Sequence, residues 1–364
     1  RTLTGTSLSD NNDITAAATG NSATSTITAA SGLDLVQAAA AGQANLDIDS
    51  SLAAAADNDV AGDLIVSSSQ EIDGDRTLGA TVTGAVTRTR VEGLDTATVT
   101  VSNSDQASTA IGNSATSSIS SLDTTASITA STAVSNLQTI LPTTATGTTI
   151  SATTTGSIIE VRSGLDSAGG TNDTGDVTNT TISVAGNDQT AGATGSVSTQ
   201  SITLDASSIT GEATAAVIRD ASTTTNTLQL SADGDSIIGN VQTIASDVTV
   251  SGTVTNGIIN SEVVNLSSAT GDDITTSTLE VTGNRQAASA TGVSTSNALS
   301  LTSGATMSAA GAVGSVQAVG GSVTAATTTN TITNAINTVD DLEDSSMRTT
   351  ANAVTSAATG ATAT

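Results

Sequence analysis

Carboxylates carry most of the chemistry that this sequence can offer, and the stretch DNDVAGD places three of them close together. Asp57, Asp59 and Asp63 follow the spacing with which a calcium-binding loop begins, where oxygen ligands occupy alternate positions. The match then fails, because Ala61 stands at a ligand position and Ser68 replaces the closing glutamate. The three aspartates remain candidates for a calcium site, and hydrogen-bonded turns are the competing interpretation.

Neighbouring carboxylates could also act as the acid and base of a glycoside hydrolase. The adjacent pairs are Asp272-Asp273 and Asp340-Asp341. Adjacent residues on a strand point to opposite faces, so surface or turn charge explains these pairs better. The chain has no His, Cys, Lys or Tyr, which are the usual general bases and nucleophiles at neutral pH. The sequence therefore predicts no enzyme and no cofactor, with calcium as the one possible ligand.

Composition sets the class of protein. The 364 residues include no aromatic side chain and carry a net charge of −26, which argues against nucleic acid as a partner. A core without aromatic residues must be thin and repetitive. No apolar run reaches the roughly 20 residues of a membrane span, and the chain starts at Arg1 without Met. We expect an extracellular or cell-surface protein, and a processed N-terminus is compatible with this.

The chain repeats a phrase built around a glutamine and a glycine. Three copies align without gaps, a fourth near the start has Ile14 instead of glutamine, and a partial fifth ends the chain. The aligned positions are Gln106, Gln189 and Gln286 for glutamine, and Gly20, Gly112, Gly195, Gly292 and Gly360 for glycine. Aliphatic residues stand seven before the glutamine (Val99, Ile182, Leu279), five before it (Val101, Val184, Val281) and thirteen after it (Ile119, Ile202, Leu299). Such self-similarity is stronger evidence for the fold than local secondary-structure patterns, and it predicts a repeat architecture.

The repeat divides the chain into one continuous domain of long units. The glycines lie 92, 83, 97 and 68 positions apart. We expect units at approximately 1–98, 99–181, 182–278 and 279–346, with a partial copy at 347–364. A second phrase, with Gln37, Gln138, Gln242 and Gln317, lies at a variable distance from the glycine, as in solenoids whose loops differ in length.

Alternating Thr, Val and Ile between clusters of Gly, Asn, Asp and Ser predict short strands and many corners. The expected fold is a single elongated all-β solenoid, a parallel β-helix. With coils of roughly 18 to 25 residues, the chain would make about 15 to 20 coils. At about 4.8 Å per rung this is a rod of roughly 70 to 95 Å. Two alanine runs leave helix or strand open for residues 32–59.

The repeated residues have expected structural roles. We expect the glycines at equivalent corners, where positive φ or close packing excludes other residues. The glutamines should donate hydrogen bonds to the backbone of neighbouring turns. Arg88 and Arg90 share one strand face and should form ion pairs within the chain. Both ends of a solenoid expose unpaired backbone, so residues 1–30 of one copy are expected to meet residues 335–364 of the next.

The stretch QASTAIGNSA, from Gln106 to Ala115, resembles the Gln, Gly and Asn pattern of curlin repeats, the units of bacterial adhesive fibres. More broadly, the chain is similar to repetitive bacterial surface proteins, including holdfast anchors. This resemblance implies secretion, adhesion and fibre formation, and it transfers no site residues. The leading hypothesis is a structural subunit of an extracellular or surface-attached fibre in adhesion or biofilm matrix, polymerising head-to-tail. The alternatives are a calcium-assisted carbohydrate- or surface-binding module, or a phage fibre segment.

Overall fold

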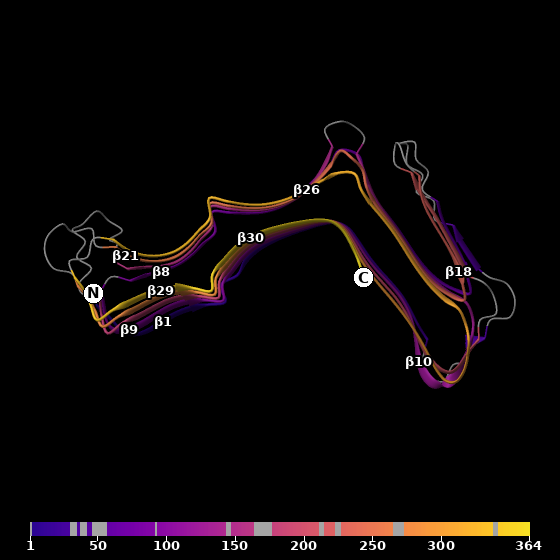
Figure 1. Ribbon diagram of the computed structural model, residues 1–364, viewed down its shortest axis with the longest axis horizontal. Helices are drawn as coiled ribbons and strands as arrows, with labels where there is room; N and C mark the ends of the chain where they lie inside the picture. The colour runs from indigo at the N-terminus through magenta and orange to yellow at the C-terminus, as the bar shows by residue number, and fades with distance from the viewer. Residues whose placement is uncertain are drawn as a thin grey trace.

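Every element in the described part of the chain is a β-strand, and most strands pair in parallel (Figure 1). The computed structural model describes residues 2–29, 35–36, 42–45, 57–91, 93–142, 147–163, 177–210, 215–222, 227–264, 273–337 and 341–364. The many β-branched residues favour this continuous ladder pairing. Proline, which interrupts ladder hydrogen bonds, occurs once in the chain.

Five parallel sheets, which we call A to E in chain order, contain most of the strands. Sheet A holds β1 (Thr2–Asp10), β9 (Gly93–Ser102), β14 (Val177–Thr178), β15 (Thr181–Ala185), β22 (Ile274–Thr275), β23 (Thr278–Thr282), β28 (Leu342–Glu343) and β29 (Ser346–Thr350). Sheet B holds β2 (Ile14–Ala29), β3 (Leu35–Val36), β10 (Asp105–Thr129), β16 (Asp188–Thr210), β24 (Arg285–Ser308) and β30 (Ala353–Ala363). Sheet C holds β6 (Leu64–Asp73), β11 (Thr132–Leu141), β19 (Ser236–Ile244) and β25 (Gly311–Val319).

Sheet D holds β7 (Thr77–Thr83), β12 (Thr148–Thr155), β20 (Val248–Thr255) and β26 (Ser322–Thr328). Sheet E holds β8 (Val86–Val91), β13 (Ile158–Ser163), β21 (Ile258–Val264) and β27 (Thr331–Asn337). An antiparallel side sheet holds β4 (Gly42–Asn45), β5 (Asp57–Gly62), β17 (Ala215–Ser222) and β18 (Thr227–Gly234).

The chain passes through sheets A to E once and then starts the next passage directly alongside the previous one. It runs out along sheets A and B and returns along sheets C, D and E, which forms a bent, two-walled band (Figure 1). We call these passages layers. Layer 1 runs from β1 to β8, layer 2 from β9 to β13, layer 3 from β14 to β21, layer 4 from β22 to β27, and layer 5 from β28 to β30.

The expected coil length of about 18 to 25 residues is wrong. Residues that pair in sheet B are 92, 83, 97 and 68 positions apart, so the long repeat unit makes one layer instead of several coils. The rod of roughly 70 to 95 Å is therefore wrong too, because four full layers at about 4.8 Å span only about 19 Å.

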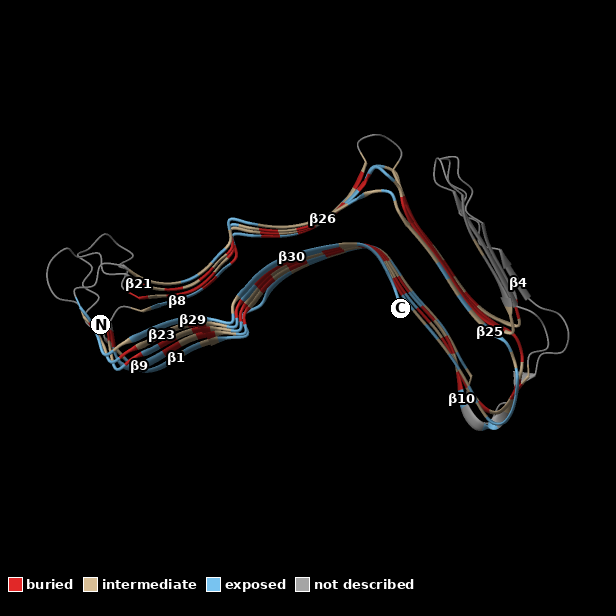
Figure 2. Cartoon of the chain, viewed as in Figure 1, coloured by how far each residue is buried: buried red, intermediate tan, exposed pale blue. Residues whose placement is uncertain are grey.

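The core lies between the two walls (Figure 2). The aliphatic columns of sheet A, including Val99 and Val101, pack against Ile159 of sheet E. Sheet B contributes small Ala110 opposite Ile150 of sheet D. Burying each Val, Leu or Ile contributes about 1.5–3 kcal/mol, so these columns can hold the walls together without aromatic residues.

Sheet C is covered on both sides. Every residue of β19 is buried, and so is nearly every residue of β11. One face packs against sheet B through residues such as Val134. On the other face, Leu137 and Val241 pack with Leu230 of the side sheet. The side sheet is thus an insertion that seals the outer wall.

The sequence left helix or strand open for residues 32–59, and the described part of this region is strand. Strands β3 and β4 and the start of β5 fall in this region. Both alanine runs lie outside the described residues.

Candidate assembly interface

The repeated glutamines form a ladder inside sheet B. Gln106, Gln189 and Gln286 are consecutive partners and are fully buried. Gln189 Nε2 donates to Gln106 Oε1 at 2.8 Å, and Gln286 Nε2 donates to Gln189 Oε1 at 2.8 Å. Gln189 and Gln286 therefore each tie their layer to the layer before it.

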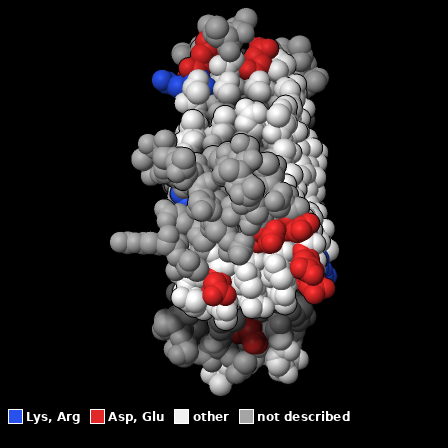
Figure 3. All heavy atoms as spheres, turned by 90° about the vertical axis from the view of Figure 1, so that its left-hand side faces the viewer, with Lys and Arg blue, Asp and Glu red and all other residues white. Residues whose placement is uncertain are grey.

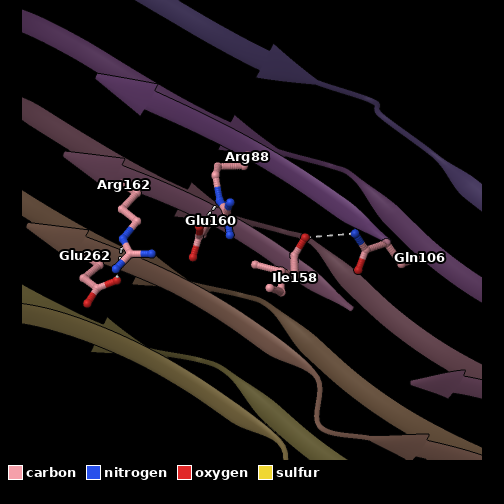
Figure 4. Close-up of polar contacts among 6 residues, drawn as sticks. All are labelled: Arg88, Gln106, Ile158, Glu160, Arg162 and Glu262. Carbon is pink, nitrogen blue, oxygen red and sulfur yellow. Dashed lines mark hydrogen bonds and ion pairs between the residues drawn. The ribbon is translucent and has the colours of Figure 1, made fainter. Parts of the chain in front are cut away.

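The same amides join the two walls. Gln106 Nε2 donates to the carbonyl oxygen of Ile158 at 3.0 Å (Figure 4). Gln189 Nε2 donates to the carbonyl oxygen of Ser157 at 2.8 Å. Buried polar groups are costly unless they are paired, so this ladder fixes how sheet B meets the start of sheet E. The glutamines do donate to backbone of the facing wall, as the repeat predicts.

A second glutamine ladder runs through sheet C. Gln138 donates to Gln70, Gln242 donates to Gln138, and Gln317 donates to Gln242, at 2.7, 2.7 and 3.0 Å. Gln37, which the repeated phrase places in this series, lies outside the described residues. Gln70 is the first member in the structure.

An asparagine ladder follows the corner between sheets A and B. Asn284 Oδ1 accepts hydrogen bonds from the backbone N–H and the side chain of Asn187, and Asn352 Oδ1 accepts the same pair from Asn284. Sequence reasoning missed these residues. The signal was available, because asparagine stands two positions before Gln189 and Gln286.

The repeated glycines lie within the long strands of sheet B and make close contacts between layers. None of the five has positive φ. A Cβ on Gly195 would lie 2.4 Å from Ile244 Cδ1 and 2.5 Å from the carbonyl oxygen of Gly292. Close packing, and not a left-handed corner, therefore requires glycine here. The left-handed corner between sheets A and B is instead made by Asn11, Asn103, Gly186, Gly283 and Ala351.

Ion pairs also connect successive layers. Arg88 pairs with Glu160, and Arg162 Nε lies 3.0 Å from Glu262 Oε2 (Figure 4). The expected pairing of Arg88 within the chain is confirmed. The Arg162–Glu262 pair is partly exposed and contributes about 0–1 kcal/mol, whereas Glu160 is buried beside Arg88.

A column of carboxylates marks the start of sheet B. Asp105 is the partner of Asp188, which is the partner of Arg285, and the Asp105 backbone N–H donates to Asp13 Oδ1 at 3.0 Å. Burial raises the pKa of Asp105, and the charges of Asp188 and Asp13 raise it further. Burial also raises the pKa of Asp188, while Arg285 lowers it.

The other acidic candidates are described only in part. Asp63 Oδ2 accepts hydrogen bonds from the Ser131 backbone N–H at 2.7 Å and from its hydroxyl at 2.9 Å. Asp57 and Asp59 lie on β5, and their side chains are outside the described set. Asp273 and Asp341 are described, whereas Asp272 and Asp340 are not. Among the residues described, no three acidic side chains group as metal ligands would.

Apolar side chains are exposed at both ends of the stack, in the first layer and in the last two layers. Eight of the nine large exposed hydrophobic residues belong to the first layer or to the uncovered strands of the last two. They are Leu8, Ile14 and Val86 in layer 1, Met307 and Val313 in layer 4, and Leu342, Met347 and Val354 in layer 5. A hollow of about 400 Å³ in layer 1 is lined by Gly20, Ile72 and Leu78 among others.

The side of the molecule that is on the left in Figure 1 is largely uncharged where side chains are described, with separate groups of Asp and Glu and smaller basic areas (Figure 3). In the described residues there is no helix of the length and apolar character that a membrane span needs.

No protein-family model, no curated protein and no solved structure matches this chain. The fold and the ladders therefore carry the functional argument alone.

Proposed function

We propose that the chain is a structural subunit of an extracellular or surface-attached fibre, a β-solenoid whose copies stack head-to-tail along the stack axis. The observation that carries the proposal is that, among the strands described, the same three sheets each end in a strand that pairs on one side. Sheets C, D and E begin with β6, β7 and β8 and finish with β25, β26 and β27. Exposed strand edges are templates for pairing with another chain.

The columns within the molecule supply the pattern for such pairing. Each internal contact between layers joins equivalent residues, and copies that stack would repeat that contact. Each copy carries a net charge of −26, so the sides of neighbouring filaments repel one another. This repulsion favours growth along the axis over lateral association. A heterologous contact of this kind propagates as a filament.

Electron microscopy and sedimentation at rising protein concentration test the proposal. The wild-type chain should form unbranched filaments. Val313→Lys adds a charge on the edge strand β25, where the side chain is 51% exposed, and should prevent filaments without unfolding the chain. Leu122→Lys is the matched control, because Leu122 is 66% exposed but lies in layer 2. Monomers of the wild-type chain at every concentration would refute a fibre subunit.

A further inference from the structure

We infer that residues 341–364, which include layer 5, occupy the position on layer 4 to which layer 1 of the next copy binds. These residues must therefore dissociate from layer 4 before a second copy can pair along its whole edge. This inference rests on the proposed stacking. The edge of layer 4 is the docking surface, and residues 341–364 control access to it.

The edge of layer 4 is only partly covered. Strands β28, β29 and β30 pair with β22, β23 and the first part of β24. In the described residues, β25, β26 and β27 pair only with layer 3. If layer 1 of another copy sat on top of layer 5, these three strands would face it across a gap of one strand, about 4.8 Å. Contact between residues 1–30 and 335–364 alone would leave most of the edge unpaired.

Layer 1 of a second copy fits directly on layer 4. It is one continuous passage through the five sheets, and the internal register sets its partners. Gln70 would lie on Gln317 and extend a ladder in which each glutamine donates to the previous layer. The same register places Val66 on Val313, and Glu71 on uncharged Ala318. Apolar and amide columns would continue without opposing like charges.

Strand β30 imitates strand β2. Both replace the repeated glutamine with an aliphatic residue, Ile14 or Val354. Residues 354–364 and 14–24 are then identical at seven of eleven positions. The identical pairs are Thr15/Thr355, Ala17/Ala357, Ala18/Ala358, Thr19/Thr359, Gly20/Gly360, Ala23/Ala363 and Thr24/Thr364. Strand β30 pairs with β24 in the same register in which β2 pairs with β10, but the two strands lie at opposite edges of sheet B. In that register, β2 of a second copy would take the place of β30 on β24.

Exchange favours the second copy. Strands β1 and β2 of the second copy replace the displaced strands of layer 5. In addition, three strands of layer 4 gain partners, namely β25, β26 and β27, which have 9, 7 and 7 residues. Asp13 of the second copy would become the strand partner of Arg285, whose partner in the isolated chain is Ala353. Layer 5 is also loosely held, since ten of the eleven residues of β30 are exposed. Layer 5 therefore caps the isolated chain and yields to a second copy.

A disulfide that locks layer 5 in place tests the inference. Ser289 and Ala357 are partners on β24 and β30, and both are exposed. Parallel partners are about 4.8 Å apart, within disulfide range, and the chain has no other cysteine. The control is Thr116→Cys with Thr199→Cys, an exposed pair that joins layers 2 and 3. Elongation is followed by light scattering and microscopy, and folding by circular dichroism.

Oxidised Ser289→Cys/Ala357→Cys should elongate at least tenfold more slowly than its reduced form, while the control elongates equally in both. A chain without residues 341–364 should elongate with a shorter lag than the full chain. Equal elongation of the oxidised and reduced locked variant, or slower growth of the truncated chain, would overturn the cap and leave the fibre proposal standing. Filaments from no chain, wild type included, would overturn both.

Discussion

At the scale of single residues, the glycine column determines how closely the layers approach. A Cβ on Gly112, Gly195 or Gly292 would lie 2.4–2.5 Å from the carbonyl oxygen of the next glycine. Gly360, at the end of the column, has nothing within 4 Å of such a Cβ. The same residue type therefore has different importance at different layers.

This difference gives a matched pair of substitutions. Gly195→Ala should lower the free energy of unfolding by roughly 1–3 kcal/mol, because backbone and Ile244 must move to make room. Gly360→Ala should be nearly neutral. Urea denaturation of the two variants measures the difference, and equal stability would show that the layers are not packed as closely as described.

The carboxylate column predicts a pH dependence. The raised pKa of Asp105 means that the folded chain binds this proton more tightly than the unfolded chain. Its ionisation therefore disfavours folding at neutral pH, and stability recovers as the pH falls through the raised pKa. Asp105→Asn should increase the free energy of unfolding at pH 7 by about 0.2–1 kcal/mol, and the gain should vanish when the carboxyl is protonated in both states.

Asp10 is the control with the opposite sign. Hydrogen bonds from Ser102 and Asn103 lower the pKa of Asp10, so its contribution is present above the unfolded pKa and is lost as the pH falls through the folded value. Asp10→Asn should therefore reduce stability at pH 7. Thermal unfolding from pH 3 to pH 7 would contradict this account if the two variants shifted in the same direction.

At the scale of elements, the glutamine ladders couple strands of different layers. Gln189 donates to Gln106, Ser157 and Ile258. Gln189→Leu should cost about 1–3 kcal/mol for each buried acceptor left without a donor. Gln317→Leu, at the open end of the sheet C ladder, should cost less, because water can reach that edge. Chemical denaturation compares them, and a larger loss for Gln317→Leu would contradict a buried ladder.

The alignment of repeats predicted the strand register well. It placed Val99, Ile182 and Leu279 in one column, and these residues are partners in sheet A. Ser7 and Ser9, aligned with Val99 and Val101, pair with those residues. Equivalent residues stack in parallel repeats, so similarity and register carry the same information.

The path of the chain between the columns could not be read from the same pattern. A strand has the same alternation whether the coil closes after about 20 residues or after a whole repeat unit, and only long-range pairing distinguishes the two. The phrase around Gln37 was matched by local similarity, whereas the stretch around Gln70 was missed, although β6 and β11 are identical at four of their ten paired positions. The glycine column was found, but sequence could not show that contact between layers, instead of backbone conformation, requires it.

At the scale of the whole molecule, the strands at both ends of the stack have an outer edge of the same kind that pairs between the internal layers. The contact between layers is repeated four times along sheet B. In the described residues, layer 1 contributes strands to all five sheets, whereas layer 5 contributes strands to sheets A and B alone. In the proposed fibre, growth by stacking would extend this existing contact, and layer 5 would determine when the edge of layer 4 is free.

The axial rise per subunit in filaments, measured by cryo-electron microscopy, tests the central claim that one repeat unit makes one layer. Four layers per copy predict a rise of about 19 Å, with strands perpendicular to the axis at about 4.8 Å. A rise of about 24 Å would mean that layer 5 stays in place between copies. A rise of about 70 Å or more would mean several short coils in each repeat unit, and would contradict the layered architecture itself.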